Sequence, residues 1–179
     1  IVLYMDFIKY LLTLEKFGID TAFSVTGGGS MFLNDALGNS KKIKVIYMHH
    51  EQSCAIAAES YARLKNKPAL VCVTTGPGGI NALNGVFGAY TDSVPLIIVS
   101  GQVKRETNMF FKKSKNLRQL GDQENDIISM VSKITKVSLQ VKSKKNLINN
   151  LNKLLKLSTQ GRPGPIWIDI PIDIQSELL

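Results

Sequence analysis

The sequence predicts an α/β fold in three α/β/α layers, with a doubly wound, six-stranded, mainly parallel sheet. Strand-like and helix-like segments alternate six times along the 179 residues, which is the pattern of parallel sheets with crossover helices. Two strand-like segments, 69–74 and 94–100, are continuous apolar runs, as expected for strands buried on both faces. No internal repeat or low-complexity tract interrupts the alternation. We therefore expect one domain over residues 1–179, a length that allows a proper core.

The strand-like segments are apolar and rich in β-branched residues. In chain order they cover residues 21–25, 43–47, 69–74, 94–100, 134–141 and 166–171. We expect the segment 134–141 to lie at an edge of the sheet. Right-handed crossovers place the carboxyl ends of parallel strands at one side. Glycine-bearing turns at Gly27, Gly76 and Gly101 should therefore meet there, together with Glu51.

The helical segments repeat apolar residues at three- and four-residue intervals. In chain order they cover residues 4–17, 31–37, 51–64, 80–90, 126–131 and 143–157. Gly18 ends the first of them, and Ser30 is a candidate N-cap for the second. The third helix is rich in alanine, and we expect its inner faces to carry Ile56, Ala58, Tyr61 and Ala62.

Two stretches fall outside the alternation. Residues 104–121 are charged and have no clean period, so they predict a long surface loop with a short helix. Loops of this length in compact domains are often functional. After the last strand, residues 173–175 are interpreted as a linker.

The net charge of +8 comes mainly from lysines, which cluster in residues 104–118 and 133–156. The second cluster lies on a helix with an apolar stripe, so its lysines form a solvated face. Aromatic residues are not interleaved with the basic residues, which argues against nucleic-acid binding. An anionic ligand or partner remains compatible with the charge. No apolar run is long enough to span a bilayer, so no membrane contact is expected.

Cysteine and histidine usage predicts no metal site in this chain. Cys54 and Cys72 have no metal-ligand spacing, and two cysteines do not make a disulfide framework. His49 and His50 are adjacent, so their side chains point in different directions. A reducing, cytoplasmic setting is the default expectation for such a chain.

Glu51 lies where a predicted strand ends and a helix begins. Ligands bind at this edge of open α/β sheets, so the carboxylate is a candidate site group. The alternative is that Glu51 only complements the helix dipole, because acidic residues are common in the first turn of helices.

The glycine-rich turns do not match a dinucleotide or phosphate-loop motif. The turn over residues 27–29 has Phe32 where the dinucleotide motif needs glycine, and no G-x-x-x-x-G-K-[ST] run occurs. Glycines without Cβ atoms still let backbone approach a ligand closely. The turn over residues 75–79 is stiffened by Pro77 and suits contact with a flat ring. Each turn taken alone is also compatible with a plain strand-to-helix connection.

Six motifs in this order closely resemble the N-terminal, pyrimidine-binding domain of thiamine diphosphate enzymes, in the acetolactate synthase and 2-oxo-acid decarboxylase family. The resemblance covers nearly the whole chain. The motifs are Val25-Thr26-Gly27-Gly28-Gly29-Ser30-Met31, His50-Glu51-Gln52, Thr74-Thr75-Gly76-Pro77-Gly78-Gly79-Ile80-Asn81, Asp92-Ser93-Val94-Pro95-Leu96-Ile97, Gly101-Gln102-Val103 and the run from Arg162 to Pro171.

The resemblance implies a role for each matching residue. Glu51 corresponds to the glutamate that hydrogen-bonds N1′ of the aminopyrimidine and so activates the cofactor. Gln102 corresponds to a glutamine near the cofactor and substrate, and these two are the implied catalytic residues. The implied cofactor-binding residues are Thr26, Gly27, Glu51, Thr75, Gly76, Pro77, Gly78 and Asn81.

The resemblance also implies what lies outside this chain. The family's diphosphate-binding domain holds Mg²⁺ with a Gly-Asp-Gly run and an asparagine pair, and neither occurs here. The family's site forms between subunits, so a homodimer or homotetramer and a small 2-oxo acid substrate are implied. The chain is interpreted as part of a longer protein or as a separately encoded subunit. FAD, used by some members, is left undecided, and a non-catalytic nucleotide-binding or dimerisation module is the alternative function.

The chain departs from acetolactate synthases in its first loop and after Gln102. Thr26 stands where those enzymes have proline, and Gly29 stands where they have alanine. A basic stretch replaces their Asp-Ala-Phe-Gln-Glu motif, whose end corresponds to Gln123-Glu124. Because that region shapes the substrate pocket, acetolactate synthesis is one candidate reaction among several. Four small residues are either a dimer contact or an internal helix contact, and these are Ala55, Ala58, Gly85 and Gly88.

Overall fold

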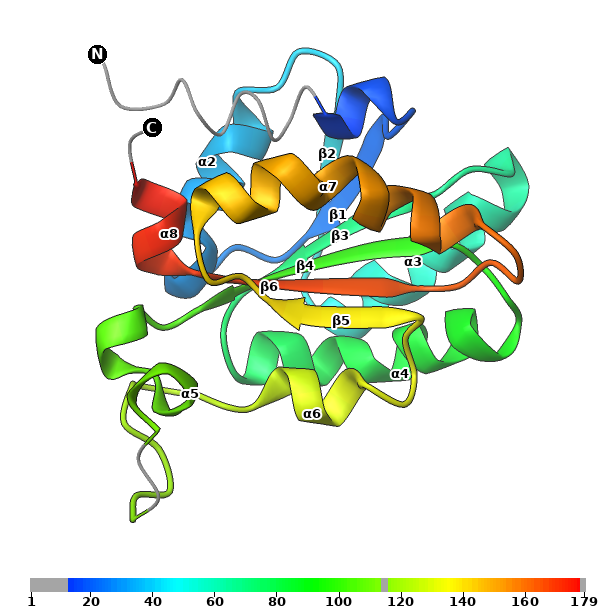
Figure 1. Cartoon of the computed structure of the whole chain (residues 1–179). Coiled ribbons are helices and arrows are strands. Elements are labelled where there is room, and N and C mark those ends of the chain that lie inside the picture. Colours follow the sequence, from blue (N-terminus) through cyan, green and yellow to red (C-terminus); the bar gives the residue numbers. More distant parts are fainter. Residues whose placement is uncertain (1–12, 114–115, 178–179) are drawn as a thin grey trace.

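A single six-stranded sheet organises the chain (Figure 1). The computed structural model describes residues 13–113 and 116–177. All six strands are parallel, in the order β2-β1-β3-β4-β6-β5. The strands are β1 (Thr21–Ser24), β2 (Lys44–Tyr47), β3 (Ala69–Val73), β4 (Leu96–Gln102), β5 (Val137–Gln140) and β6 (Ile166–Pro171). The predicted fold class is confirmed, and β5 lies at the predicted edge.

Helices cover both faces of the sheet in three layers (Figure 1). One face packs against α2 (Met31–Gly38), α7 (Lys144–Thr159) and α8 (Ile172–Ser176). The other face packs against α3 (Glu51–Lys65), α4 (Pro77–Thr91) and α6 (Ile127–Val131). Short helical turns occupy the remaining connections, and these are η1 (Gly28–Ser30), η2 (Arg105–Thr107) and α5 (Met109–Lys112).

The two apolar cores follow from the alternation of side chains along each strand. In β3, Leu70 and Cys72 join the core under α7, whereas Val71 joins the core under α3 and α4. In β6, Ile168 faces the first core and Trp167 the second. Continuous apolar runs in the sequence are therefore explained by burial on both sides.

Helices α3 and α4 pack together through small residues. A Cβ atom at Gly85 of α4 would come within 2.6 Å of the Ala55 Cβ atom on α3. Ala58 and Ala62 are buried as expected. The expectation that Ile56 faces inward is wrong, because its side chain is 46% exposed. Ala55 takes the face toward α4, and Ile56 lies about 100° further round the helix, so its side chain is directed outward.

The segment after β6 is a helix, not the linker that we expected. Within α8, Ile174 and Gln175 are buried, and the helix packs against α2 and β6. The predicted helix over residues 4–17 lies mostly outside the described residues, although residues 13–16 are helical. The basic stretch after β4 contains the two short turns η2 and α5, as predicted for residues 104–121.

The strand order reverses direction between β1 and β3. From β1 the chain moves outward to β2, and it then returns past β1 to β3 and continues in the opposite direction. At such a switch point the two following loops diverge and leave a crevice, where α/β domains bind ligands. The loops after β1 and β3 are the two glycine-rich turns, 26–30 and 74–79.

Candidate functional site

The two glycine-rich turns lie against each other at the switch point. A Cβ atom at Gly27 would overlap the Thr74 side chain, and one at Gly29 would overlap the Thr75 hydroxyl. The Gly29 N–H donates a hydrogen bond to Thr74 Oγ1 at 3.1 Å. Gly101 at the end of β4 approaches Gly29 so closely that a Cβ there would overlap the Gly29 carbonyl group. The three predicted turns therefore meet at one edge, as expected.

Gly76 has a backbone conformation that only glycine adopts readily. Its φ of 63° and ψ of −117° lie in a region where a Cβ atom clashes with the chain. Pro77 then occupies the first turn of α4, where its missing N–H costs nothing. Together the two residues reverse the chain sharply, so that α4 begins directly above the switch point.

Glu51 is buried to 9% exposure at the first turn of α3. His50 caps this helix, because its Nδ1 accepts a hydrogen bond from the Gln52 N–H at 3.1 Å. The Glu51 carboxylate instead reaches α4, where Asn81 Nδ2 donates to Oε2 at 3.0 Å. Its other oxygen, Oε1, lies 3.5 Å from the position that a Cβ atom would have at Gly78. The carboxylate therefore lies beside the second glycine turn rather than in bulk solvent.

The remaining predicted cofactor-binding residues lie in the two glycine turns at different depths. Thr26 and Pro77 are exposed, whereas Thr75, Gly76 and Gly78 are buried. The Thr75 Oγ1 atom is buried and has no hydrogen-bond partner among the described residues. This oxygen lies against the first glycine turn, because a Cβ atom at Gly29 would come within 2.0 Å of it.

Gln102 lies below the open edge, with 1% of its surface exposed. Its amide nitrogen donates to the Asn125 carbonyl oxygen at 3.2 Å and to Asp169 Oδ2 at 3.1 Å. Its amide oxygen accepts from the Val103 N–H at 3.0 Å. These bonds hold the side chain against β6 and the segment before α6, and its catalytic role stays a prediction.

Asp169 in β6 is a fully buried carboxyl group without a cationic partner among its contacts. Its oxygens accept hydrogen bonds from Ser100 Oγ at 2.5 Å, Gln102 Nε2 at 3.1 Å and Gln140 Nε2 at 2.9 Å. Burial raises the pKa of Asp169 from 3.8 to about 7, with a small further increase from Asp126, although the three hydrogen bonds oppose the shift.

Asp169→Asn is expected to change how stability depends on pH. Between about pH 4 and 7 the unfolded carboxyl is ionised and the native one protonated, so the wild-type free energy of unfolding falls as pH rises. From pH 5 to 8 the difference between the proteins should shift by about 3 kcal/mol in favour of the asparagine variant. Urea unfolding at both pH values measures this shift, and a constant difference would contradict the raised pKa.

Two residues at the site were not identified as site residues from the sequence. Gln123 has a positive φ of 56°, and its carbonyl oxygen lies directly over Gly76. Glu124 holds the preceding loop, because its carboxylate accepts from the N–H groups of Met109, Leu120 and Gly121. Only the match of Gln123-Glu124 to the end of a family motif pointed toward this placement.

The parallel fold and its site define an α/β domain that places a buried carboxylate beside closely packed glycine turns at a switch point. Residues 9–130 match the family model described as the thiamine pyrophosphate enzyme, N-terminal TPP binding domain. The chain therefore belongs to the thiamine pyrophosphate enzyme family, as the resemblance in its motifs predicted.

Curated relatives agree with this assignment. The chain is 37% identical over 168 residues to a chloroplastic acetolactate synthase of Arabidopsis thaliana, covering 92% of this chain and 23% of that protein. It is 34% identical over 166 residues to an acetolactate synthase large subunit of Lactococcus lactis, covering 93% of this chain and 27% of that protein. The chain thus spans about a quarter of the length of the relatives that it matches.

Membrane-spanning helices and clusters of metal-ligating side chains do not occur among the described residues. No helix among residues 13–113 and 116–177 is both long and apolar enough to cross a membrane. The same residues contain no group of three or more histidine, cysteine, aspartate or glutamate side chains arranged to hold a metal ion.

Proposed function

We propose that this chain is the pyrimidine-binding half of a thiamine diphosphate-dependent enzyme that acts on a 2-oxo acid in an acetolactate synthase-like reaction. The observation that carries the proposal is the placement of Glu51. Its carboxylate is buried at the start of α3, accepts a hydrogen bond from Asn81, and lies beside the second glycine turn, with Oε1 3.5 Å from where a Cβ atom at Gly78 would lie. Family membership and the acetolactate synthase relatives support the same assignment.

The residues present fit the flat aminopyrimidine ring. The glycines at 76 and 78 let the turn pack closely against Gln123 and Thr74 beside the Glu51 carboxylate, and the buried Thr75 hydroxyl has no hydrogen-bond partner among the described residues. Glu51 offers a carboxylate that binds a ring nitrogen and shares a proton with it. When bound, thiamine diphosphate supplies a carbon nucleophile and an electron sink for decarboxylation. The contribution of this chain is therefore to hold the ring and to set its proton balance.

We assign the diphosphate and Mg²⁺ to a domain outside these residues. Magnesium prefers carboxylate and water oxygens in octahedral geometry. The proposed partner is that domain in a second copy of the protein, which makes the assembly a dimer at least. Large apolar side chains on the outer surfaces of α3 and α4 support this proposal, since Ile56 is 46% and Phe87 56% exposed. At Gly88 nothing lies within 4 Å of an added Cβ, so a partner backbone has room to approach.

The proposal is tested on the intact protein. Supplied with thiamine diphosphate, Mg²⁺ and pyruvate as the probe acid, it should release CO₂ and form a carboligated product. Omission of the cofactor should abolish CO₂ release, and sedimentation should show that the active species is a dimer or larger. Absence of heat in a calorimetric titration with millimolar thiamine diphosphate and Mg²⁺ would overturn the assignment.

A further inference from the structure

The C-terminal helix α8 contacts the first glycine turn through Gln175. The side chain is buried to 2% exposure, and its amide nitrogen donates to the Gly29 carbonyl oxygen at 2.8 Å and to the Ile170 carbonyl oxygen at 2.7 Å. Both neighbours are acceptors, so only the NH₂ side of the amide fits between them. Gln175 therefore joins the end of β6 to a turn that lies 146 residues earlier in the chain.

Gly29 is held on both of its peptide groups. Its carbonyl oxygen accepts from Gln175, and its N–H donates to Thr74 Oγ1, which leads directly into the turn with Gly76. The backbone at Gly101 also packs directly against the Gly29 carbonyl group, because a Cβ atom at position 101 would lie 2.0 Å from the Gly29 oxygen. A displacement of Gln175 would therefore move Gly29 and, through Thr74, the floor of the proposed pyrimidine site.

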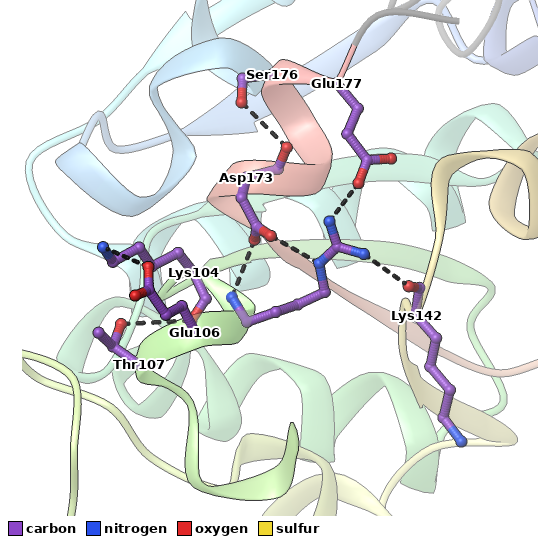
Figure 2. Close-up of polar contacts among 8 residues, drawn as sticks. Lys104, Glu106, Thr107, Lys142, Asp173, Ser176 and Glu177 are labelled. Atoms are coloured by element: carbon purple, nitrogen blue, oxygen red, sulfur yellow. Dashed lines mark hydrogen bonds and ion pairs between the residues drawn. The ribbon is translucent and has the colours of Figure 1, made fainter. Parts of the chain in front are cut away.

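Helix α8 is in turn fixed by Arg105, the first residue of η2. Its guanidinium binds Asp173 Oδ2 through Nε at 2.6 Å and also pairs with Glu177, while its backbone N–H donates to Asp173 Oδ1 at 3.0 Å. Figure 2 shows the carboxylates of Asp173 and Glu177 extending from this helix toward the basic segment that carries Lys104 and Glu106.

The Arg105 cluster is stronger than a typical surface ion pair. The side chains of Arg105 and Asp173 are only 34% and 32% exposed, so their attraction is less screened by water. Arg105 also donates to the Lys142 carbonyl oxygen at 3.4 Å, which ties in the chain after β5. A helix of five residues has little stability of its own, so these contacts add to the burial of Ile174 in fixing where α8 lies.

We propose that α8 is a brace by which Arg105 in the basic loop positions the cofactor turn, through Asp173, Gln175 and Gly29. Arg105 and Gln175 are positioning residues in this proposal, which rests on the proposed function for its effect on cofactor binding. The basic loop thereby affects the pyrimidine site at a distance, through one short helix.

The test compares Arg105→Ala, Gln175→Ala and the double variant in the intact protein. Hydrogen exchange of the segment containing the Gly29 amide is measured without cofactor, and each single variant should raise its rate about tenfold. The half-saturating concentration of thiamine diphosphate with Mg²⁺ should rise about tenfold, while kcat at saturation changes little. Because the two residues do not touch, independent effects would multiply to about a hundredfold. A shared brace predicts that the double variant stays near tenfold.

Two further variants separate positioning from general destabilisation. Lys104→Ala removes a neighbouring exposed charge whose ion pair among the described residues is with Glu106, and it should leave both readouts unchanged. Arg105→Lys keeps a charge beside Asp173 and should restore part of the protection.

The outcomes distinguish the brace from the proposed function. Unchanged exchange at Gly29, exchange raised equally throughout the protein, or multiplicative effects in the double variant would each overturn the brace. If the variants raise exchange locally at Gly29 but the wild-type protein binds no thiamine diphosphate, the proposed function is overturned. The contact between α8 and Gly29 then still stands.

Discussion

Glu51→Gln should lower the rate of hydrogen exchange at C2 of bound thiamine diphosphate by about 10²–10⁴-fold. Glutamine has nearly the same shape and can still contact Asn81, which now donates to one carboxylate oxygen at 3.0 Å. It cannot share a proton with a ring nitrogen, because an amide does not titrate near neutral pH. The expected result is therefore a loss of cofactor activation with the fold and cofactor affinity largely retained.

Isotope exchange in the intact enzyme measures this effect directly. Glu59→Gln on the same helix is the matched control, because Glu59 lies outside the site and pairs with Arg63. Loss of such a surface pair costs less than about 1 kcal/mol and should not alter exchange. Equal exchange rates in the wild type and the Glu51→Gln variant would remove Glu51 from this role.

Gly76→Ala is expected to destabilise the protein by about 3 kcal/mol or more and to abolish cofactor binding. The glycine-only backbone conformation alone accounts for about 1–3 kcal/mol. The added Cβ would also overlap the Gln123 carbonyl oxygen. That oxygen belongs to the backbone and cannot rotate away, so the turn or the Gln123 segment has to move.

Urea unfolding of the intact protein gives the change in free energy. Gly38→Ala in α2 provides the control, since the nearest atom to an added Cβ there is Tyr47 Oη at 3.7 Å, an ordinary van der Waals contact. Removing a helical glycine at such a position should stabilise the protein by about 1 kcal/mol. A Gly76→Ala protein as stable as the wild type would show that this turn does not require glycine.

The sequence carried most of the information about the fold. Strands 69–74 and 94–100 were identifiable because burial on both faces produces continuous apolar runs. The outward direction of the Ile56 side chain was not identifiable from the sequence, because periodicity does not reveal how closely two helices approach. That distance is set by the pairing of Ala55 with Gly85, which are 30 positions apart in the sequence.

The candidate site was predictable only in part. Glu51 and the turn over residues 75–79 follow strands directly, so the topology fixes where they lie. Gln123 reaches Gly76 only through the path of the loop over residues 104–121, which no local pattern determines. Gln175 was missed for a similar reason, because its burial depends on the Gly29 carbonyl group, far away in the chain.

The tight contact between Gly85 and Ala55 has a consequence for evolution of the reaction centre. Glu51 and Asn81 stand at the starts of the two helices that this contact joins. The separation of the helix axes therefore sets the reach between carboxylate and amide. Any gain in bulk at position 55 or 85 would widen that separation. Sequence drift at two inconspicuous interior positions is thus constrained by chemistry that takes place about one helical turn away.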